Sequence, residues 1–180
     1  MAQYGGKELA ASFRQVRGNT IQVAEDIPED QYGFKAAPTT RSAGQLLTHI
    51  AFGSTIQMQV HSIKIDDLKK LNFPELMQKL GAEDAKSRSK AEIVALLKAE
   101  GDKYASFLEG LSDAFLAERV MMPPGASPAS KSRLEMLLSP KEHEMHHRGQ
   151  LMLIERILGL VPHLTRQTQE RMAQAQAARG

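Results

Sequence analysis

The 180-residue sequence contains no cysteine. This absence excludes disulfide bonds, thiolate metal ligands and a cysteine nucleophile, and it is consistent with a reducing compartment. Aromatic residues make up 5% of the chain and β-branched residues are also sparse, whereas alanine, leucine, glutamine and long charged residues are abundant. Because the abundant residues favour helices and the sparse ones favour strands, the composition predicts an all-helical protein.

Long apolar runs are absent as well. No segment approaches the roughly 20 consecutive apolar residues that a membrane span needs, and Met1–Lys7 has no apolar signal-peptide core. The net charge is +2, with acids and bases interleaved, and we interpret the basic cluster at residues 86–90 as a solvated helix entry. We therefore expect a cytoplasmic protein that binds neither membranes nor nucleic acids.

The length is that of a single domain, and 42% of hydrophobic residues suffices for a buried core. Apolar residues at spacings of three and four predict a helix over residues 6–26, which Ile27–Pro28 ends. The capping-box sequence at residues 42–45 predicts a second helix that continues to about Lys64, and the one at residues 89–92 predicts a third.

The last long helix is predicted to begin near Ser130 or Ser132. Its end is marked by Gly159, which suits the left-handed position that follows many helices. Pro140 lies inside this segment, where it either kinks the helix or starts a new one that Ser139 caps. The sequence leaves both possibilities open.

The remaining segments are predicted to be less regular, with a short helix at residues 74–80 and a connecting loop at residues 122–128. Four long amphipathic helices imply a four-helix bundle, which we assign to residues 1–162. The polar residues 163–180 are expected to form a peripheral helix or a frayed tail.

Six histidines occur, and three of them lie within residues 142–150. His143 and His147 are four positions apart, so a helix presents both imidazole rings on one face, one turn apart. Two rings at this spacing can hold one metal ion, as in zinc proteases, although such pairs also occur on solvated faces. His146 points about 100° away from His147 and is therefore either beside the site or exposed.

His49 lies on the apolar face of the second predicted helix, between Leu46 and Gly53. A histidine there must lose its water and find a partner, so it is either a hydrogen-bonded core residue or a third ligand from a facing helix. Gly53 provides open space beside the ring or permits close helix packing. Together, His49, His143 and His147 predict a site for one divalent metal ion.

Four polar residues flank the histidine pair. A metal-bound histidine donates its other N–H group to a carboxylate, a carbonyl or water, so these four are candidates to orient the rings, the alternative being a solvated face. Arg148 is also a candidate to hold an anionic substrate or an interhelical carboxylate. His61 and His163 stand alone and are assigned no role. The four flanking residues are Glu142, Glu144, Arg148 and Gln150.

Two segments, one within residues 32–51 that ends around His49 and one within residues 143–159 that contains His143 and His147, carry motifs of a known family. They resemble the DinB-like (YfiT-like) family of four-helix-bundle metalloproteins. The first is similar to the family's loop and second-helix motif, which ends in a ligand histidine, and the second is similar to its last-helix motif. The helix order and spacing match over about residues 5–162, with a departure at Ser139–Pro140, where members usually continue as helix. The first segment comprises Tyr32–Phe34, Pro38 and Arg41–Ala51, and the second comprises His143–Leu151 and Leu158–Gly159.

The resemblance implies an up-down-down-up four-helix bundle, often a homodimer, with zinc or nickel bound by His49, His143 and His147. Some members are thiol-dependent S-transferases or isomerases that use a low-molecular-weight thiol. This chain, which lacks cysteine, would take such a thiol from outside. Many members have no established activity.

Three neutral imidazoles leave an open coordination position, which is typical of catalytic rather than structural zinc sites, and nickel accepts imidazole as well. We therefore predict a metal-dependent enzyme that acts on a small molecule, either by thiol transfer or by hydrolysis. The alternatives are a non-catalytic, stress-associated metal-binding bundle and a bundle whose histidines are only structural.

Overall fold

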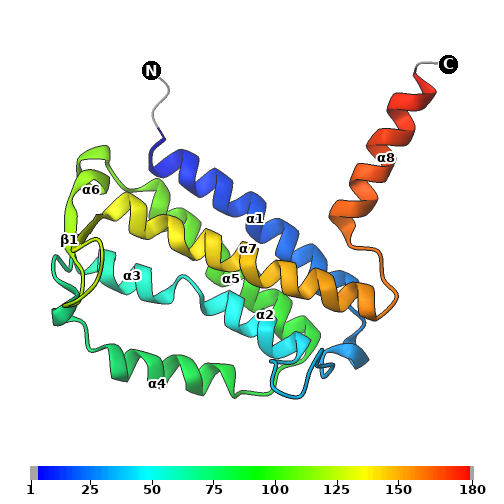
Figure 1. Cartoon of the computed structure of the whole chain (residues 1–180), viewed down its shortest axis with the longest axis horizontal. Helices are drawn as coiled ribbons and strands as arrows, with labels where there is room; N and C mark the ends of the chain where they lie inside the picture. Colours follow the sequence, from blue (N-terminus) through cyan, green and yellow to red (C-terminus); the bar gives the residue numbers. More distant parts are fainter. Residues whose placement is uncertain (1–3, 179–180) are drawn as a thin grey trace.

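The computed structural model describes residues 4–178, and its long helices lie side by side along a common direction (Figure 1). α1 and α7 run one way, whereas α2–α3 and α5 run the other way, so the predicted up-down-down-up bundle is confirmed. The helices of the bundle are α1 (Gly6–Asp26), the consecutive pair α2 (Ala43–Phe52) and α3 (Thr55–Ser62), α5 (Lys90–Glu109) and α7 (Arg133–Ile157).

The ends of the predicted domain and tail, residues 1–3 and 179–180, lie outside the described residues, as does the start of Met1–Lys7. Within residues 4–178, no helix combines the length and the apolar character that crossing a bilayer requires. The predicted helix over residues 6–26 coincides with α1, and both predicted capping boxes form at the starts of α2 and α5.

α2–α3 and α5 are parallel, so the chain must return along the bundle between them. The returning segment contains the 3-10 turn η2 (Leu68–Lys70) and α4 (Phe73–Asp84), which packs against the outer side of α2 (Figure 1). Asn72 caps α4 by accepting a hydrogen bond from the Glu75 N–H group. The helix is longer than the predicted residues 74–80 and extends to Asp84, which it places beside α2.

α7 is one continuous helix that passes through Pro140. Ser132 caps its start, whereas the Ser139 hydroxyl donates to the Met136 carbonyl instead of capping a new helix. Gly159 adopts a φ of 79°, and its backbone N–H donates to the carbonyl of Arg156 at 3.1 Å. The end of α7 is therefore where the sequence predicts it. Of the two possibilities for Pro140, a new helix that starts there is excluded.

The predicted second helix is interrupted at Gly53–Ser54 and continues as α3. A Cβ atom on Gly53 would lie 2.9 Å from Nδ1 of His143, closer than side-chain atoms normally approach. The glycine therefore allows close packing of α2 against α7. Glycine also has a low helix propensity, so the helix is weakest at this position. The prediction of an unbroken helix to Lys64 is wrong because this contact between distant segments overrides the local pattern.

The connecting loop at residues 122–128 is flanked by a small antiparallel ladder that the sequence does not reveal. β1 (Arg119–Met121) pairs with β2 (Ser130–Ser132) directly before α7. The short helix α6 (Asp113–Ala117) precedes the ladder, and the 3-10 turn η1 (Glu29–Gln31) lies in the loop after α1. α6 and the ladder close one end of the bundle and set the start of α7, whereas η1 lies at the other end, where α1 finishes (Figure 1).

A buried ion pair lies between two large clusters of apolar core residues. One cluster includes Phe13 and Leu137, and the other includes Val23 and Leu151. The Arg17 Nε group donates to both carboxylate oxygens of Glu144, at 2.9 and 3.1 Å, and the two side chains are 5% and 1% exposed. The guanidinium also donates to the carbonyls of Leu97 and Ile50.

Arg17 thus connects all four long segments of the bundle, because it belongs to α1 and its hydrogen-bond partners lie on α2, α5 and α7. Gly101 on α5 makes room for it, since a Cβ atom there would lie 2.8 Å from Cγ of Arg17. Such a pair contributes little net stability compared with an apolar core, but removing one partner leaves an unpaired buried charge.

We expect Glu144→Gln to destabilise the fold by roughly 3–5 kcal/mol, because it strands the Arg17 charge inside the bundle. The measurement is urea unfolding in the presence of a chelator. The control is Glu142→Gln, an exposed position on the same helix that should change stability by less than about 0.5 kcal/mol. Equal effects of the two variants would contradict the role assigned to the pair.

α8 (His163–Ala177) forms the predicted peripheral helix and projects away from the bundle (Figure 1). It is held at its start by Arg166, which donates to Asp26 at 2.7 Å, and by His163, whose Nε2 lies 3.2 Å from Asn19 Oδ1. Glu155 is fully buried near this junction, and neither carboxylate oxygen has a hydrogen-bond partner among residues 4–178. Burial, with a contribution from the Asp26 charge, raises the pKa of Glu155 to about 7.

The raised pKa means that native Glu155 keeps a proton between pH 4.5 and 7 that the unfolded chain has lost, so this group costs stability as the pH rises through that window. As the pH rises from 4.5 to 8, the parent protein loses this contribution and Glu155→Gln does not. We therefore expect the free energy of unfolding of the variant, relative to that of the parent, to increase by about 3 kcal/mol over this range. The measurement is chemical unfolding of both proteins across this range. A difference that does not vary with pH would contradict the prediction.

Candidate metal centre

Three histidine side chains converge where α2 packs against α7. His49 comes from α2, whereas His143 and His147 come from successive turns of α7. Nε2 of His143 lies 3.1 Å from Nε2 of His49 and 3.1 Å from Nε2 of His147. Nitrogen ligands of one tetrahedral zinc ion are about 3.3 Å apart. The three rings that the sequence singled out are therefore brought together at a spacing that fits one metal ion.

The partners of the other ring nitrogens define the orientation of two of the three lone pairs. Nδ1 of His49 lies 3.3 Å from a carboxylate oxygen of Asp84, and Nδ1 of His147 lies 2.9 Å from Oε1 of Gln150. Because both partners are acceptors, both Nδ1 atoms carry the proton, and both Nε2 atoms present lone pairs to His143. A neutral His143 has one N–H group and can donate to only one of these two lone pairs, whereas a cation placed among the three Nε2 atoms satisfies all of them.

Burial keeps the three rings neutral. Loss of solvent is the largest cause that lowers the pKa of His49 and of His147, and it lowers the pKa of His143 to about 4. The positive charge of Arg41 adds to the effect at all three rings. At neutral pH the rings are therefore unprotonated, the form in which imidazole binds a metal.

Asp84 is the contact that sequence reasoning missed. Its carboxylate lies beside His49 and also 3.6 Å from the guanidinium of Arg41. The connection depends on α4, which returns along the bundle and ends beside α2, 35 residues after His49. One signal was available, because a carboxylate at the C-terminal end of a helix is unfavourable and therefore suggests another use.

The side chains of the four flanking residues lie in different places, and one of them contacts a clustered histidine. Gln150 contacts His147, as one interpretation of the sequence proposed, and its amide nitrogen lies 3.2 Å from Nε2 of the exposed His146. Glu142 is exposed. Glu144 and Arg148 are buried and point away from the histidines, so the prediction that they lie beside the site or on a solvated face is wrong.

The reason lies in the helix itself, since positions 144 and 148 are one residue after the two histidines and face α1 instead of α2. Glu144 pairs with Arg17, and Arg148 donates to the Val16 carbonyl at 3.1 Å. Neither Arg148 nor Glu144 lines the cavities at the histidine cluster, so Arg148 is not placed to hold a substrate there.

The two histidines that were assigned no role are buried structural residues. His61 lies 3.1 Å from Nη1 of Arg133 and 3.2 Å from Gln57, and burial lowers its pKa to about 4. His163 contacts Asn19 at the base of α8. Both lie apart from the cluster formed by the other three rings.

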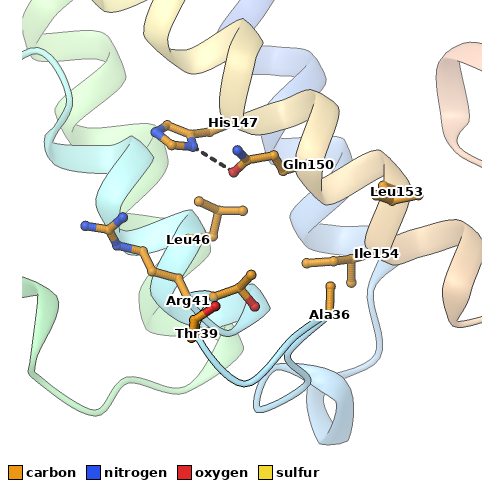
Figure 2. Close-up of a pocket in the computed structure, with 9 residues that line it drawn as sticks. Ala36, Thr39, Arg41, Leu46, His147, Gln150, Leu153 and Ile154 are labelled. Atoms are coloured by element: carbon orange, nitrogen blue, oxygen red, sulfur yellow. Dashed lines mark hydrogen bonds between the residues drawn. The ribbon is translucent and has the colours of Figure 1, made fainter.

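Two cavities open beside the histidine cluster. The first, which we call the α7 cavity, has a volume of about 380 Å³, and its wall includes His147 (Figure 2). The second, the α4 cavity, has a volume of about 410 Å³, and its wall includes His49 and His143. Arg41 lines both cavities. The remaining walls are largely apolar, so a small molecule that enters either cavity reaches the histidine nitrogens along a mostly apolar surface.

Figure 2 shows how the α7 cavity is built. His147 and Gln150 face each other from neighbouring turns of α7, and Arg41 reaches across α2 from the preceding loop. The other labelled residues on its wall are Ala36, Thr39, Leu46, Leu153 and Ile154. The wall of the α4 cavity consists of Arg41, His49, Phe52, Gly53, Ile56, Gln57, Met77, Leu80, Gly81, Asp84, Ser139, Pro140 and His143.

Comparison with solved structures finds the same architecture in bacterial proteins. YfiT from Bacillus subtilis, described as "a probable metal-dependent hydrolase with an unusual four-helix bundle topology", matches with a TM-score of 0.66 at 14% identity, over 89% of this chain and 91% of that one. A protein from Clostridium difficile 630 matches with a TM-score of 0.62 at 12% identity, over 87% and 99% of the two chains. At these identities the likeness shows the fold alone.

A DinB-like protein of Bacillus subtilis, YjoA, is similar in both sequence and structure. The uncharacterized YjoA is 25% identical over 154 residues, which cover 84% of this chain and 90% of the relative. Its crystal structure has a TM-score of 0.61 at 23% identity, over 84% and 92% of the two chains. The family model of the DinB superfamily matches residues 12–151, which include all three clustered histidines. This chain therefore belongs to the DinB superfamily.

Proposed function

We propose that this protein is a metal-dependent hydrolase in which His49, His143 and His147 hold one zinc or nickel ion. The observation that carries the proposal is the convergence of three neutral imidazole nitrogens on the walls of two cavities. YfiT, which has the same fold, is described as a probable metal-dependent hydrolase, and this supports the choice of reaction.

The residues of this chain fit such an ion. A divalent metal ion held by three histidines supplies Lewis acidity and activates water at its open position. Asp84 and Gln150 fix the tautomers of His49 and His147, so that both Nε2 lone pairs point to one place. The apolar cavity walls would bind the apolar part of a small substrate beside the histidine nitrogens.

A second candidate is the transfer of a low-molecular-weight thiol, and the specific observation in its favour is the presence of two cavities. A two-substrate reaction needs a place for the thiol and a place for its acceptor, and the α7 and α4 cavities meet different members of the histidine cluster. The chain has no cysteine, so the thiol would be a second substrate. A purely structural role for the histidines is disfavoured, because the Nε2 lone pairs of His49 and His147 both face His143, whose single ring N–H can satisfy only one of them.

We also propose that the protein is a homodimer in which α7 packs against α7 of a second copy. The supporting observation is a stripe of exposed apolar residues, four positions apart, on the outer face of this helix. Met145, Leu153 and Ile157 are 46%, 56% and 52% exposed, and Gly149 between them leaves room for close approach. Exposed apolar stripes of this kind are typical of helix–helix interfaces.

Elemental analysis tests the metal site. We expect tag-free protein to contain about one zinc or nickel ion per chain, and His143→Ala to contain almost none, because two imidazoles hold a divalent ion far more weakly than three. His146→Ala, an exposed neighbour on the same helix, is the matched control and should keep its ion. A metal content that does not change in His143→Ala would rule out the assigned ligands.

The same samples separate the two reactions. Screening with activated esters and amides, with and without an added low-molecular-weight thiol, should give turnover that chelation abolishes and metal restores. Turnover without thiol supports hydrolysis, whereas turnover that requires thiol supports the second candidate. A protein that binds its ion but turns over neither class of substrate would support a non-catalytic metal-binding bundle.

Asp84→Asn tests the orientation of His49. We expect a 10–100-fold loss of metal affinity, which is typical when the carboxylate behind a metal-binding histidine is removed. The fold should not lose stability, since a carboxylate at the end of α4 is unfavourable for that helix. Affinity is measured by competition with a chromophoric chelator, and Glu75→Gln, an exposed change on α4, serves as the control. Unchanged affinity would show that Asp84 does not orient the ring.

A further inference from the structure

The two ends of the α4 cavity differ in chemistry, and this difference constrains what it can bind. One end carries His49, His143, Arg41 and Asp84. The wall beyond them is mostly apolar and includes Phe52, Ile56, Met77 and Leu80. Pockets of a few hundred Å³ with an apolar wall and a few convergent polar groups are typical small-molecule sites. The shape therefore favours a ligand with one polar group and one apolar arm.

Arg41 is the cation at this end, and its donors are largely unused. Its side chain is 46% exposed, and its closest carboxylate, that of Asp84, lies 3.6 Å away. Among the residues that the structure describes, Arg41 donates no hydrogen bond within 3.5 Å, although a guanidinium has five N–H donors. The side chain lines both cavities and is therefore available to pair with a ligand that enters either one.

The acidic group at the same end is already in use. Asp84 is the one carboxylate in the described wall of the α4 cavity, and it contacts both His49 and Arg41. A cationic ligand would have to compete with both partners and would meet the Arg41 charge. An anionic ligand instead finds a guanidinium with free donors. The electrostatics of the cavity thus discriminate against cations and in favour of anions.

The charge of the ligand follows from the number of cations available. Arg41 is the single arginine or lysine on the described wall of the α4 cavity, and no second cation is placed to neutralise a dianion such as a phosphate monoester. The planar guanidinium matches the two oxygens of a carboxylate. A carboxylate with one negative charge therefore fits better than a phosphate.

We propose that the α4 cavity takes an amphiphilic carboxylate, with its anionic group paired to Arg41 and its apolar arm against Phe52, Ile56 and Leu80. This inference rests on the proposed function, since it makes that ligand the substrate class of the histidine site. In this proposal Arg41 selects substrates with a negative charge, and the apolar side chains of α4 select substrates with an apolar chain. A substrate of this class would carry, besides the carboxylate on Arg41, an ester or amide bond near the histidine nitrogens: water would add to its carbonyl carbon, the C–O or C–N bond would break, and a carboxylic acid and an alcohol or amine would be released. Neutral or cationic counterparts are discriminated against.

The test uses the tag-free full chain labelled with ¹³C at the methionine methyl groups, after treatment with a chelator and again after loading with zinc. Met77 lies on the wall of the α4 cavity and is 43% exposed, so its methyl signal, assigned with Met77→Leu, reports occupancy without any turnover. The probes are octanoate, 1-octanol and n-octylammonium, which have the same arm and different heads. The chelator-treated sample removes any direct carboxylate–metal contact.

We expect octanoate to shift the Met77 signal saturably and to bind at least tenfold more tightly than 1-octanol or n-octylammonium. Arg41→Met should weaken octanoate roughly 10–100-fold, the usual effect of losing a charge-assisted hydrogen bond, and leave 1-octanol unchanged. Arg41→Lys should retain part of the affinity, because it keeps the charge without the planar fork. Shortening the acid should weaken binding by about fourfold for each CH₂ group removed.

Arg14→Met is the matched control, because Arg14 is a partly exposed arginine that pairs with Glu109 away from both cavities. It should leave the octanoate affinity unchanged. Equal binding of octanoate to the parent and to Arg41→Met, tight binding of n-octylammonium, or no shift of the Met77 signal would each overturn the proposal. Metal content, measured on the same samples, reports separately on the proposed function, so that the two ideas can fail independently.

Discussion

One guanidinium fixes the relative positions of the helices on which the histidine site depends. Arg17 reaches from α1 to Glu144 on α7, to the Ile50 carbonyl on α2 and to the Leu97 carbonyl on α5. Glu144 and Ile50 directly follow His143 and His49 in the chain. An interaction in the buried layer of the bundle therefore sets the distance between the two helices that carry the histidines. The helices keep these positions because separating Arg17 from Glu144 would leave a buried charge unpaired.

The close approach of α2 and α7 also requires a glycine at position 53. Gly53 lets the ring of His143 lie against the backbone of α2, and the helix breaks into α2 and α3 at the same point. Next to this break lies the α4 cavity, whose wall includes Gly53, Phe52 and Ile56. The packing that brings the imidazoles together thus also leaves space beside them for a small molecule.

The crossover connection of the up-down-down-up bundle contributes to the site as well. Parallel α2 and α5 require a segment that runs the length of the bundle between them, and α4 is that segment. Asp84, at its end, contacts His49 and lies beside Arg41. In this chain the crossover therefore supplies more than a connection, because it delivers the Asp84 carboxylate to the outer side of the histidine cluster.

The sequence by itself determined the local features: the starts of α2, α5 and α7 at their serine caps, the end of α7 near Gly159, and the pairing of His143 with His147 on one face. Each depends on residues within one or two helical turns, where hydrogen bonding and periodicity decide the structure. The place of His49 on the apolar face of the second predicted helix singled it out as the third ligand, and the resemblance of two motifs to the DinB-like family added the helix order.

Only the tertiary structure decided the rest. It turned Glu144 and Arg148 toward α1, broke the second helix at Gly53, carried α7 through Pro140 and placed Asp84 beside His49. These outcomes depend on contacts between segments that are far apart in the chain, such as the 127 positions that separate Arg17 from Glu144. No local pattern encodes such contacts, because their free energy comes from burial and pairing that exist only once the helices have packed.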